Sequence, residues 1–289
     1  MTKSILVVTD EHDNLPIEKA HTVTSYLDAK LEFVRFLNKL DTEDEHQRQQ
    51  TIDENKKILQ QDISNICGED ANVTCNVVAT DNIADWILSA CKDNKFDFVV
   101  KASNQTDSLT HTPLDSLLMQ KLPCPIFLAS NRKWKSKKVI LAAVDLSTND
   151  KLKKDYNNIV LKWTALLSSV FDYEAHIIYS IPISRPLLEF DVIDKLEVQK
   201  SKQPEAEQKL SSLTSNFNLA DAHTHITVGT VEKNIPSLAN KLKADLVIMG
   251  CVGQKGLKDF LFGKTAENTL DKLRTDLLIC RGQRSKIRK

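Results

Sequence analysis

Four of the chain's seven glycines lie close together, directly after an apolar run that ends at Met249. They are Gly250, Gly253, Gly256 and Gly263. Glycine lets a backbone turn with positive φ and approach a ligand closely, and the N–H groups of such a loop and of the helix after it point at an anion. The cluster therefore predicts a phosphate-binding loop between a buried strand and a helix. A glycine-rich turn that binds nothing is the alternative.

The spacing of these glycines differs from two familiar phosphate-binding patterns. A Walker A loop has four residues between its first glycine and Gly-Lys-Thr, whereas six residues separate Gly256 from Gly263. The G-x-G-x-x-G pattern of dinucleotide-binding folds is absent, and the cluster follows a late strand instead of the first one. The observed pattern is G-x2-G-x9-G, counted over Gly250, Gly253 and Gly263, and polar residues follow it.

The length, composition and charge of the chain limit the classes of protein it can belong to. Its 289 residues suit two domains of roughly 140 residues each, and a hydrophobic content of 41% lets each domain bury a core. The 39 basic and 39 acidic residues cancel, which argues against a general nucleic-acid-binding protein. No stretch suits a signal peptide or a membrane span, and the six cysteines form no C-x-x-C pair. We therefore expect a cytoplasmic protein.

The chain repeats one plan in its two halves. An apolar segment closed by an aspartate occurs at 4–10 and again at 138–145, and Phe96-Asp-Phe-Val-Val-Lys101 matches Ala244-Asp-Leu-Val-Ile-Met249. Five short apolar segments with helical patterns between them indicate, in each half, a parallel, doubly wound α/β sheet with helices on both faces. The expected strands are 4–9, 31–37, 73–79, 96–101 and 125–130 in the first half and 139–145, 174–181, 222–228, 244–249 and 276–280 in the second. A basic linker beginning at Lys133 separates a domain at 1–132 from a domain at 133–289.

One helical stripe in the second half places a tryptophan in the core. Ile159, Trp163, Leu166 and Val170 recur at spacings of four, three and four residues, which is typical of the buried face of a helix. We therefore expect these four side chains to pack against the sheet.

The two halves differ at the loop that follows the fourth strand. Counting from the repeated landmarks, the three glycines of the pattern correspond to Ala102, Gln105 and Thr112, and the first-half loop contains no glycine. Side chains there would crowd a phosphate group, and left-handed turns would be strained. We expect the first half to be a degenerate copy without this site, and hence one ligand per chain.

The glycine pattern, with Ala244-Asp-Leu-Val-Ile-Met-Gly250 before it and Thr265-Ala-Glu after it, resembles the ATP loop of the universal stress protein family. The similarity extends over essentially the whole chain. The first-half segments Thr112-Pro-Leu-Asp115 and Leu122-Pro-Cys-Pro-Ile-Phe-Leu128 look most like the tandem members of the E group. The resemblance implies two tandem flavodoxin-like domains with sheet order 3-2-1-4-5, a role in the stress response, and intramolecular pairing of the two halves through their last strands. It leaves a homodimer open.

The resemblance also implies where a nucleotide would bind. In ATP-binding members adenine lies near the aspartate that ends the first strand, and the phosphates lie on the glycine loop. Carried over to this chain, the site comprises Ala143, Asp145, Met249, Gly250, Cys251, Gly253, Gly263, Lys264 and Thr265. The implied cofactor is ATP, with Mg2+ as an optional companion.

One residue of this set departs from the family pattern. Position 264 is lysine, where the family usually has Ser or Thr, whose hydroxyl can bond a phosphate oxygen. Thr265 could supply the hydroxyl and Lys264 a positive charge. The same change is equally consistent with a site that no longer takes ATP.

Three functions remain compatible with the sequence. The first is a regulatory protein that binds ATP or a related nucleotide in its second half. No Ser-His-Asp order, G-x-S-x-G elbow or paired-acid motif supplies a general base, so at most weak ATP hydrolysis is expected. The second is a binder of an apolar or lipid-like molecule in the crevice between the halves, where the first-half loop contributes Leu109 and Leu114. The third is a pure interaction protein.

His223 and His225 alternate on an expected strand, so their side chains share one face as two metal ligands would. No cysteine or carboxylate neighbour completes a ligand set, and the sequence therefore assigns no metal site. Whether they bind a metal stays open.

Overall fold

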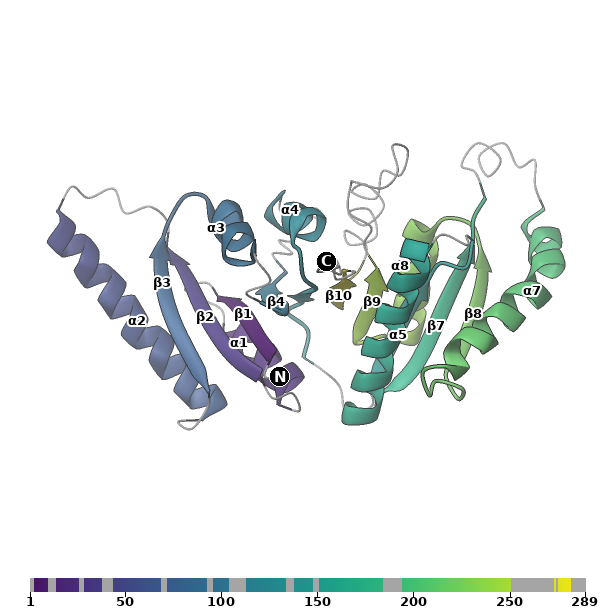
Figure 1. Cartoon of the computed structure of the whole chain (residues 1–289), viewed down its shortest axis with the longest axis horizontal. Coiled ribbons are helices and arrows are strands. Elements are labelled where there is room, and N and C mark those ends of the chain that lie inside the picture. Colours follow the sequence, from purple (N-terminus) through teal and green to yellow (C-terminus); the bar gives the residue numbers. More distant parts are fainter. Residues whose placement is uncertain are drawn as a thin grey trace, which may run out of the picture. The chain divides into compact units, whose positions relative to one another are not determined.

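The computed structural model describes residues 3–9, 14–25, 29–37, 44–68, 72–92, 96–103, 113–133, 138–147, 151–183, 194–250, 273 and 275–281. These residues form two compact units (Figure 1). Unit 1 contains the described residues up to Asn131, and unit 2 contains those from Arg132 onward.

Unit 1 is a five-stranded parallel sheet with helices between its strands. Its elements are β1 (Lys3–Thr9), α1 (Leu15–Thr24), β2 (Ala29–Leu37), α2 (Glu45–Cys67), β3 (Val73–Ala79), α3 (Ile83–Ala90), β4 (Phe98–Ala102), α4 (Pro113–Lys121) and β5 (Ile126–Ala129). The strand order is β3-β2-β1-β4-β5. Because crossovers between parallel strands are right-handed, α1 and α2 cover one face of the sheet and α3 and α4 cover the other (Figure 1).

Unit 2 repeats this plan. Its elements are β6 (Val139–Val144), α5 (Lys151–Phe171), β7 (Glu174–Ile181), α7 (Lys195–Ser215), β8 (His223–Val228), α8 (Val231–Leu242), β9 (Leu246–Gly250) and β10 (Asp276–Cys280). The strand order is β8-β7-β6-β9-β10, and every pair in it is parallel. The chain therefore extends the sheet on one side of β6 up to β8 and then returns to the other side of β6 with β9.

Both units have the α/β fold and the 3-2-1-4-5 strand order expected from the sequence. All ten expected strands are present, and their ends are shifted by at most two residues. Parallel strands are covered on both faces, so they appear in a sequence as unbroken apolar runs. Ile5, Leu6 and Val7 of β1 and Leu141 and Ala142 of β6 are each no more than 1% exposed.

An aspartate joins the same two strands in each unit. The Asp97 N–H donates to the Ser4 carbonyl at 2.8 Å, and Oδ2 of Asp97 accepts from the Ser4 N–H at 3.0 Å. In unit 2 the Asp245 N–H donates to the Val139 carbonyl at 2.9 Å, and Oδ2 of Asp245 accepts from the Val139 N–H at 3.0 Å. Both aspartates lie at the amino edge of their sheet. This repeated contact, called the aspartate clamp below, supports the internal repeat seen in the sequence.

The buried face predicted for α5 is wrong, because the residues that are buried lie one position further along the helix. The buried side chains of this helix include Val160, Leu161, Thr164 and Leu167, whereas Leu166 is 38% exposed. Apolar residues occupy two adjacent stripes of α5, and both have helical spacing, so the sequence alone did not distinguish them. Like every other helix in the described part of the chain, α5 is not long and apolar enough to cross a bilayer.

Candidate functional site

The centre of unit 2 brings together the four predicted site residues that the structure describes. Ala143 of β6 lies beside Met249 of β9 in the parallel register, and Asp145 and Gly250 lie at the same edge. The strand order reverses between β6 and β9. Ligands of doubly wound sheets bind in the crevice outside the carboxyl ends of the strands at such a reversal. The other five predicted residues lie outside the described part of the chain: Cys251, Gly253, Gly263, Lys264 and Thr265.

Asp145 shapes the turn that leaves β6. Its N–H donates to Oδ1 of Asn157 at 2.9 Å, and Nδ2 of Asn157 donates to the Asp145 carbonyl at 2.8 Å. Its carboxylate Oδ1 accepts from the Ser147 N–H at 2.9 Å and also from the Ser147 hydroxyl. Aspartate commonly stabilises turns in this way. The α5 residue Asn157 thus fixes the backbone of Asp145, and Asp145 in turn holds Ser147.

Gly250 lies close to helix α5, so the absence of a side chain matters for packing as well as for a ligand. A Cβ atom at this position would lie 3.1 Å from Cβ and 3.4 Å from Cδ1 of Tyr156 on α5. A side chain at this position would therefore require Tyr156 or the end of β9 to shift by a few tenths of an ångström. Part of the glycine signal in the sequence has a structural cause that sequence spacing did not reveal.

A buried tyrosine at this edge of the sheet is influenced by two nearby carboxylates. Tyr179 of β7 pairs in register with Val144, which precedes Asp145. Burial raises the pKa of the Tyr179 phenol to about 12, and the charges of Asp145 and Glu205 add to this effect. A ligand group next to Asp145 is therefore favoured if it donates hydrogen bonds and disfavoured if it carries negative charge.

The corresponding edge of unit 1 contains a buried ion pair. Lys101 occupies the position that Met249 has in the repeat, and its Nζ lies 2.9 Å from Oδ1 of Asp115 on α4. The same ammonium group donates to the Ala102 carbonyl at 2.7 Å. The side chains of Lys101 and Asp115 are only 6% and 0% exposed. The sequence signal for this pair is a lysine near the end of an otherwise apolar strand.

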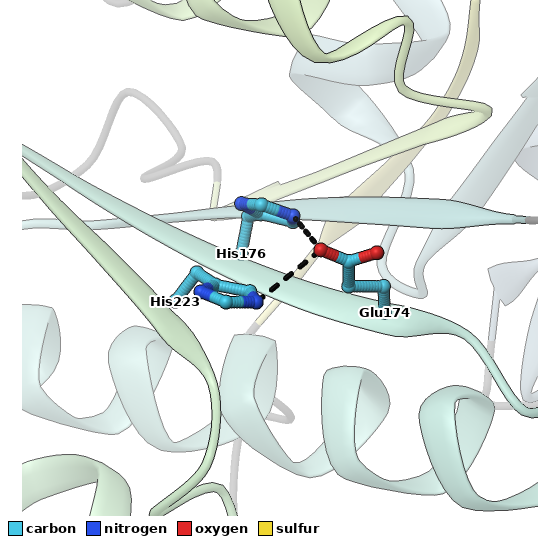
Figure 2. A group of neighbouring side chains, drawn as sticks. All are labelled: Glu174, His176 and His223. Atoms are coloured by element: carbon cyan, nitrogen blue, oxygen red, sulfur yellow. Dashed lines mark hydrogen bonds and ion pairs between the residues drawn. The ribbon is translucent and has the colours of Figure 1, made fainter.

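A second group of polar side chains lies at the amino ends of β7 and β8 (Figure 2). Oε1 of Glu174 lies 3.1 Å from Nε2 of His176 and 3.2 Å from Nε2 of His223. Nδ1 of His176 lies 2.9 Å from Nε2 of His225. The expectation that no carboxylate completes a ligand set with the two histidines of β8 is wrong, because Glu174 lies beside His223 in space. Glu174 lies on the neighbouring strand β7. Its alternation with His176 was the sequence pattern that indicated a shared face.

The histidines of this group stack on one another. The His176 ring is 4.8 Å from the His223 ring and 5.1 Å from the His225 ring, measured between centroids. Burial lowers the pKa of His225, and the charges of His176, His223 and Lys241 lower it further. The neutral form of His225 is thereby favoured, and a neutral imidazole has one nitrogen that can accept a hydrogen bond.

The fold defines a protein of two similar α/β units, and in the second unit the strand order reverses between β6 and β9. The family model described as "Universal stress protein family" matches residues 137–281. The chain belongs to the universal stress protein family.

Curated relatives support the expected likeness to the E group. The chain is 26% identical over 278 residues to the universal stress protein E homolog of Haemophilus influenzae, covering 94% of this chain and 89% of that protein. It is 30% identical over 190 residues to universal stress protein E of Salmonella typhi, covering 63% of this chain and 60% of that protein.

Solved structures share the fold over nearly the whole chain. A functionally unknown protein from Pseudomonas aeruginosa PAO1 has a TM-score of 0.73 at 23% identity, covering 98% of this chain and 93% of that chain. A universal stress protein from Archaeoglobus fulgidus DSM 4304 has a TM-score of 0.62 at 13% identity, covering 98% and 97%. At these identities the likeness shows the fold.

Proposed function

We propose that this chain is a stress-response regulatory protein that binds ATP or a related nucleotide at the carboxyl edge of β6 and β9. One observation carries the proposal. The register pair of Ala143 and Met249 brings Asp145 and Gly250 to the strand-order reversal, and Gly250 is the first glycine of the pattern. A ligand bound there would contact the ends of β6 and β9. The glycine-rich segment follows β9 directly in the sequence and would supply the remaining contacts.

The charges at this edge indicate how the nucleotide is oriented. Asp145 is half-buried, and its negative charge contributes to the raised pKa of Tyr179. Such a position favours a group that donates hydrogen bonds, such as the exocyclic amino group of adenine, and disfavours a phosphate. The phosphates therefore belong on the glycine segment, whose backbone N–H groups suit an anion.

The described residues favour binding over turnover. The Asp145 carboxylate accepts two hydrogen bonds from Ser147, and its backbone is fixed by Asn157. A carboxylate that stabilises a turn in this way is a poor general base, because a proton on it would weaken those contacts. We infer that the protein acts as a regulator through nucleotide binding itself, and that it hydrolyses the nucleotide slowly at most.

Unit 1 serves this function without a nucleotide of its own. At the corresponding edge of unit 1, Lys101 has the position that Met249 has in unit 2, and it forms an ion pair with Asp115. The segment that follows Ala102 contains no glycine before α4. We therefore expect one nucleotide per chain.

Calorimetric titration of the full chain with ATP tests the proposal. We expect one site per chain, and we expect Gly253→Asp to abolish binding because it adds a carboxylate and a Cβ to the phosphate loop. Gln254→Asp adds the same charge at the next position and keeps the glycine pattern, so it is the matched control. The ligand-induced rise in melting temperature should disappear only in the glycine variant.

The identity of any ligand that co-purifies gives an independent outcome. Denaturing the protein should release a molecule with adenine absorbance. A released lipid would instead support the alternative of an apolar ligand. Two equivalent ATP sites, or an unchanged affinity in Gly253→Asp, would overturn the proposal.

A further inference from the structure

Four polar side chains meet on one face of two neighbouring strands. Glu174 and His176 alternate along β7, His223 and His225 alternate along β8, and the register places His176 beside His223. Since successive side chains of a strand point to opposite faces, all four share one face of the sheet. Because the strands of a parallel sheet are mostly apolar, a group of four neighbouring polar side chains needs a physical explanation.

We propose that Glu174, His176 and His223 form a binding site for a divalent transition-metal cation, with Zn2+ as the best match. The three residues each offer one ligand atom, and these atoms all lie within 4.8 Å of one another. Figure 2 shows both imidazole rings directed at one oxygen of the Glu174 carboxylate.

The separations are those of a metal ligand set. Zinc lies about 2.0–2.1 Å from histidine nitrogens and about 2.0–2.2 Å from carboxylate oxygens, so neighbouring ligands of a tetrahedral site are about 3.3 Å apart. The distances from Oε1 of Glu174 to the two Nε2 atoms are 3.1 and 3.2 Å. Two of the three separations thus match this spacing, and all three ligand atoms lie within 4.8 Å of one another, so side-chain rotations have to bring the third pair to the same spacing. The exposed residue His223, whose side chain is 60% accessible, is the one free to make them.

The ligand types select the class of metal. Two imidazoles and one carboxylate suit zinc and its neighbours among the transition metals, whereas Mg2+ and Ca2+ prefer sites made entirely of oxygen. Three protein ligands leave the fourth tetrahedral position for water. The exposure of His223 and the partial exposure of Glu174, at 60% and 30% of their side chains, give solvent and the ion a way in.

His225 orients the buried ligand. His176 can bind a metal through Nε2 only if its other ring nitrogen carries the proton, and Nδ1 of His176 lies 2.9 Å from Nε2 of His225. A metal-bound histidine almost always donates its second N–H to such an acceptor. His225 is thus a positioning residue for His176.

The metal site is separate from the proposed nucleotide site. Glu174 is the first residue of β7, and His223 is the first residue of β8, so the cluster lies at the amino edge of the sheet. The nucleotide is proposed to bind at the carboxyl edge. The metal proposal therefore stands on its own observations and does not depend on the nucleotide.

Zinc titration of the chelator-treated full chain tests the proposal. We expect one Zn2+ per chain with a dissociation constant in the micromolar range or below and a rise in melting temperature on binding. Glu174→Gln and His223→Ala should each weaken binding at least tenfold, and His225→Ala should weaken it by roughly 10–100-fold through the lost hydrogen bond. His46→Ala removes an exposed histidine of α2 and is the matched control, with unchanged binding expected.

Cobalt substitution identifies the ligand atoms. Co2+ held by nitrogen and oxygen should give visible absorption without the intense near-ultraviolet band of a thiolate ligand, and Glu174→Gln should change the visible spectrum. His223 is on the surface, so His223→Ala is expected to fold, and its melting temperature with chelator should equal that of the parent. Absence of zinc binding by the parent, equal affinity in His223→Ala, or a thiolate band would each overturn the proposal. In those cases the cluster is a hydrogen-bonded network only.

Discussion

The ammonium group of Lys101 lies 2.9 Å from Oδ1 of Asp115, and both side chains are almost completely buried. This pair connects the end of β4 to α4 at the edge where unit 2 has its proposed nucleotide site. Two opposite charges in such a place stabilise the protein only while both are present, because either one alone would be buried without its counter-charge.

The first prediction follows from this pair. Asp115→Ala should lower the free energy of unfolding by about 3–5 kcal/mol, because it leaves the Lys101 ammonium buried and uncompensated. Lys101→Met with Asp115→Leu replaces the pair by apolar side chains, the first of them the residue that unit 2 has at Met249. This double variant should recover most of the loss in urea unfolding. If the double variant is no more stable than Asp115→Ala, the two charges are not coupled.

The second prediction separates packing from ligand binding at Gly250. Gly250→Ala places a Cβ atom 3.1 Å from Cβ of Tyr156, so the helix or the strand must move. We expect a loss of about 1–3 kcal/mol in unfolding free energy without any nucleotide, as is typical of overpacking. Gly253→Ala provides the comparison at a glycine assigned only to the ligand. Urea unfolding of a Gly250→Ala protein as stable as the parent would contradict the packing role.

The third prediction concerns Lys264, which lies outside the described residues. If its charge replaces the hydroxyl usual in the family, Lys264→Ala removes a charge-assisted contact of about 1.5–3 kcal/mol with the phosphates. ATP should then bind at least tenfold more weakly, since 1.4 kcal/mol is a factor of ten. Lys264→Ser should recover much of the loss, and Lys255→Ala is the control for general loop charge. Equal ATP affinity in all variants at low salt would leave Lys264 without a role.

The fourth prediction concerns alkaline stability. The pKa of Tyr179 is about 12 in the folded protein against 10 for an ordinary phenol, mainly because of burial. Above pH 10 the unfolded chain loses this proton first, so stability that is complete below pH 10 should fall as the pH approaches 12. Unfolding free energies measured across this window should fall less steeply in Tyr179→Phe than in the parent.

Asp145→Asn is the companion variant for this titration. It removes the first of the two charges that add to the effect of burial. The Tyr179 pKa, followed by phenolate absorbance against the Tyr179→Phe background, should decrease but stay above 10. An unchanged pKa would mean that Asp145 does not act on this edge of the sheet.

Strands were predictable from the sequence because their burial is simple. Segments such as the one around Leu141 are covered on both faces, so every residue is apolar and the ends are marked by polar residues. The helix α5 is amphipathic with a broad apolar arc, and the choice between the stripes of Leu166 and Leu167 depends on how the helix docks. Docking involves residues far away in the sequence and leaves no local signal.

The candidate sites show the same limit. Asp145 and Gly250 could be named from a resemblance, but the contacts of Asp145 with Asn157 and of Gly250 with Tyr156 depend on the placement of α5. The meeting of Glu174 with His223 depends on the register of β7 against β8. A shift of that register by one residue would move one strand's side chains to the other face.

The aspartate clamp bears on how the two units came to differ. Asp97 and Asp245 make the same pair of hydrogen bonds at the amino edge of their sheets, whereas the carboxyl edges have Lys101 in one unit and Met249 in the other. A repeat that keeps its contacts at one rim can change the residues of the opposite rim in one copy and still fold. In unit 1, a new specificity engineered at the carboxyl rim would have to keep the buried pair of Lys101 and Asp115 or replace both of its charges.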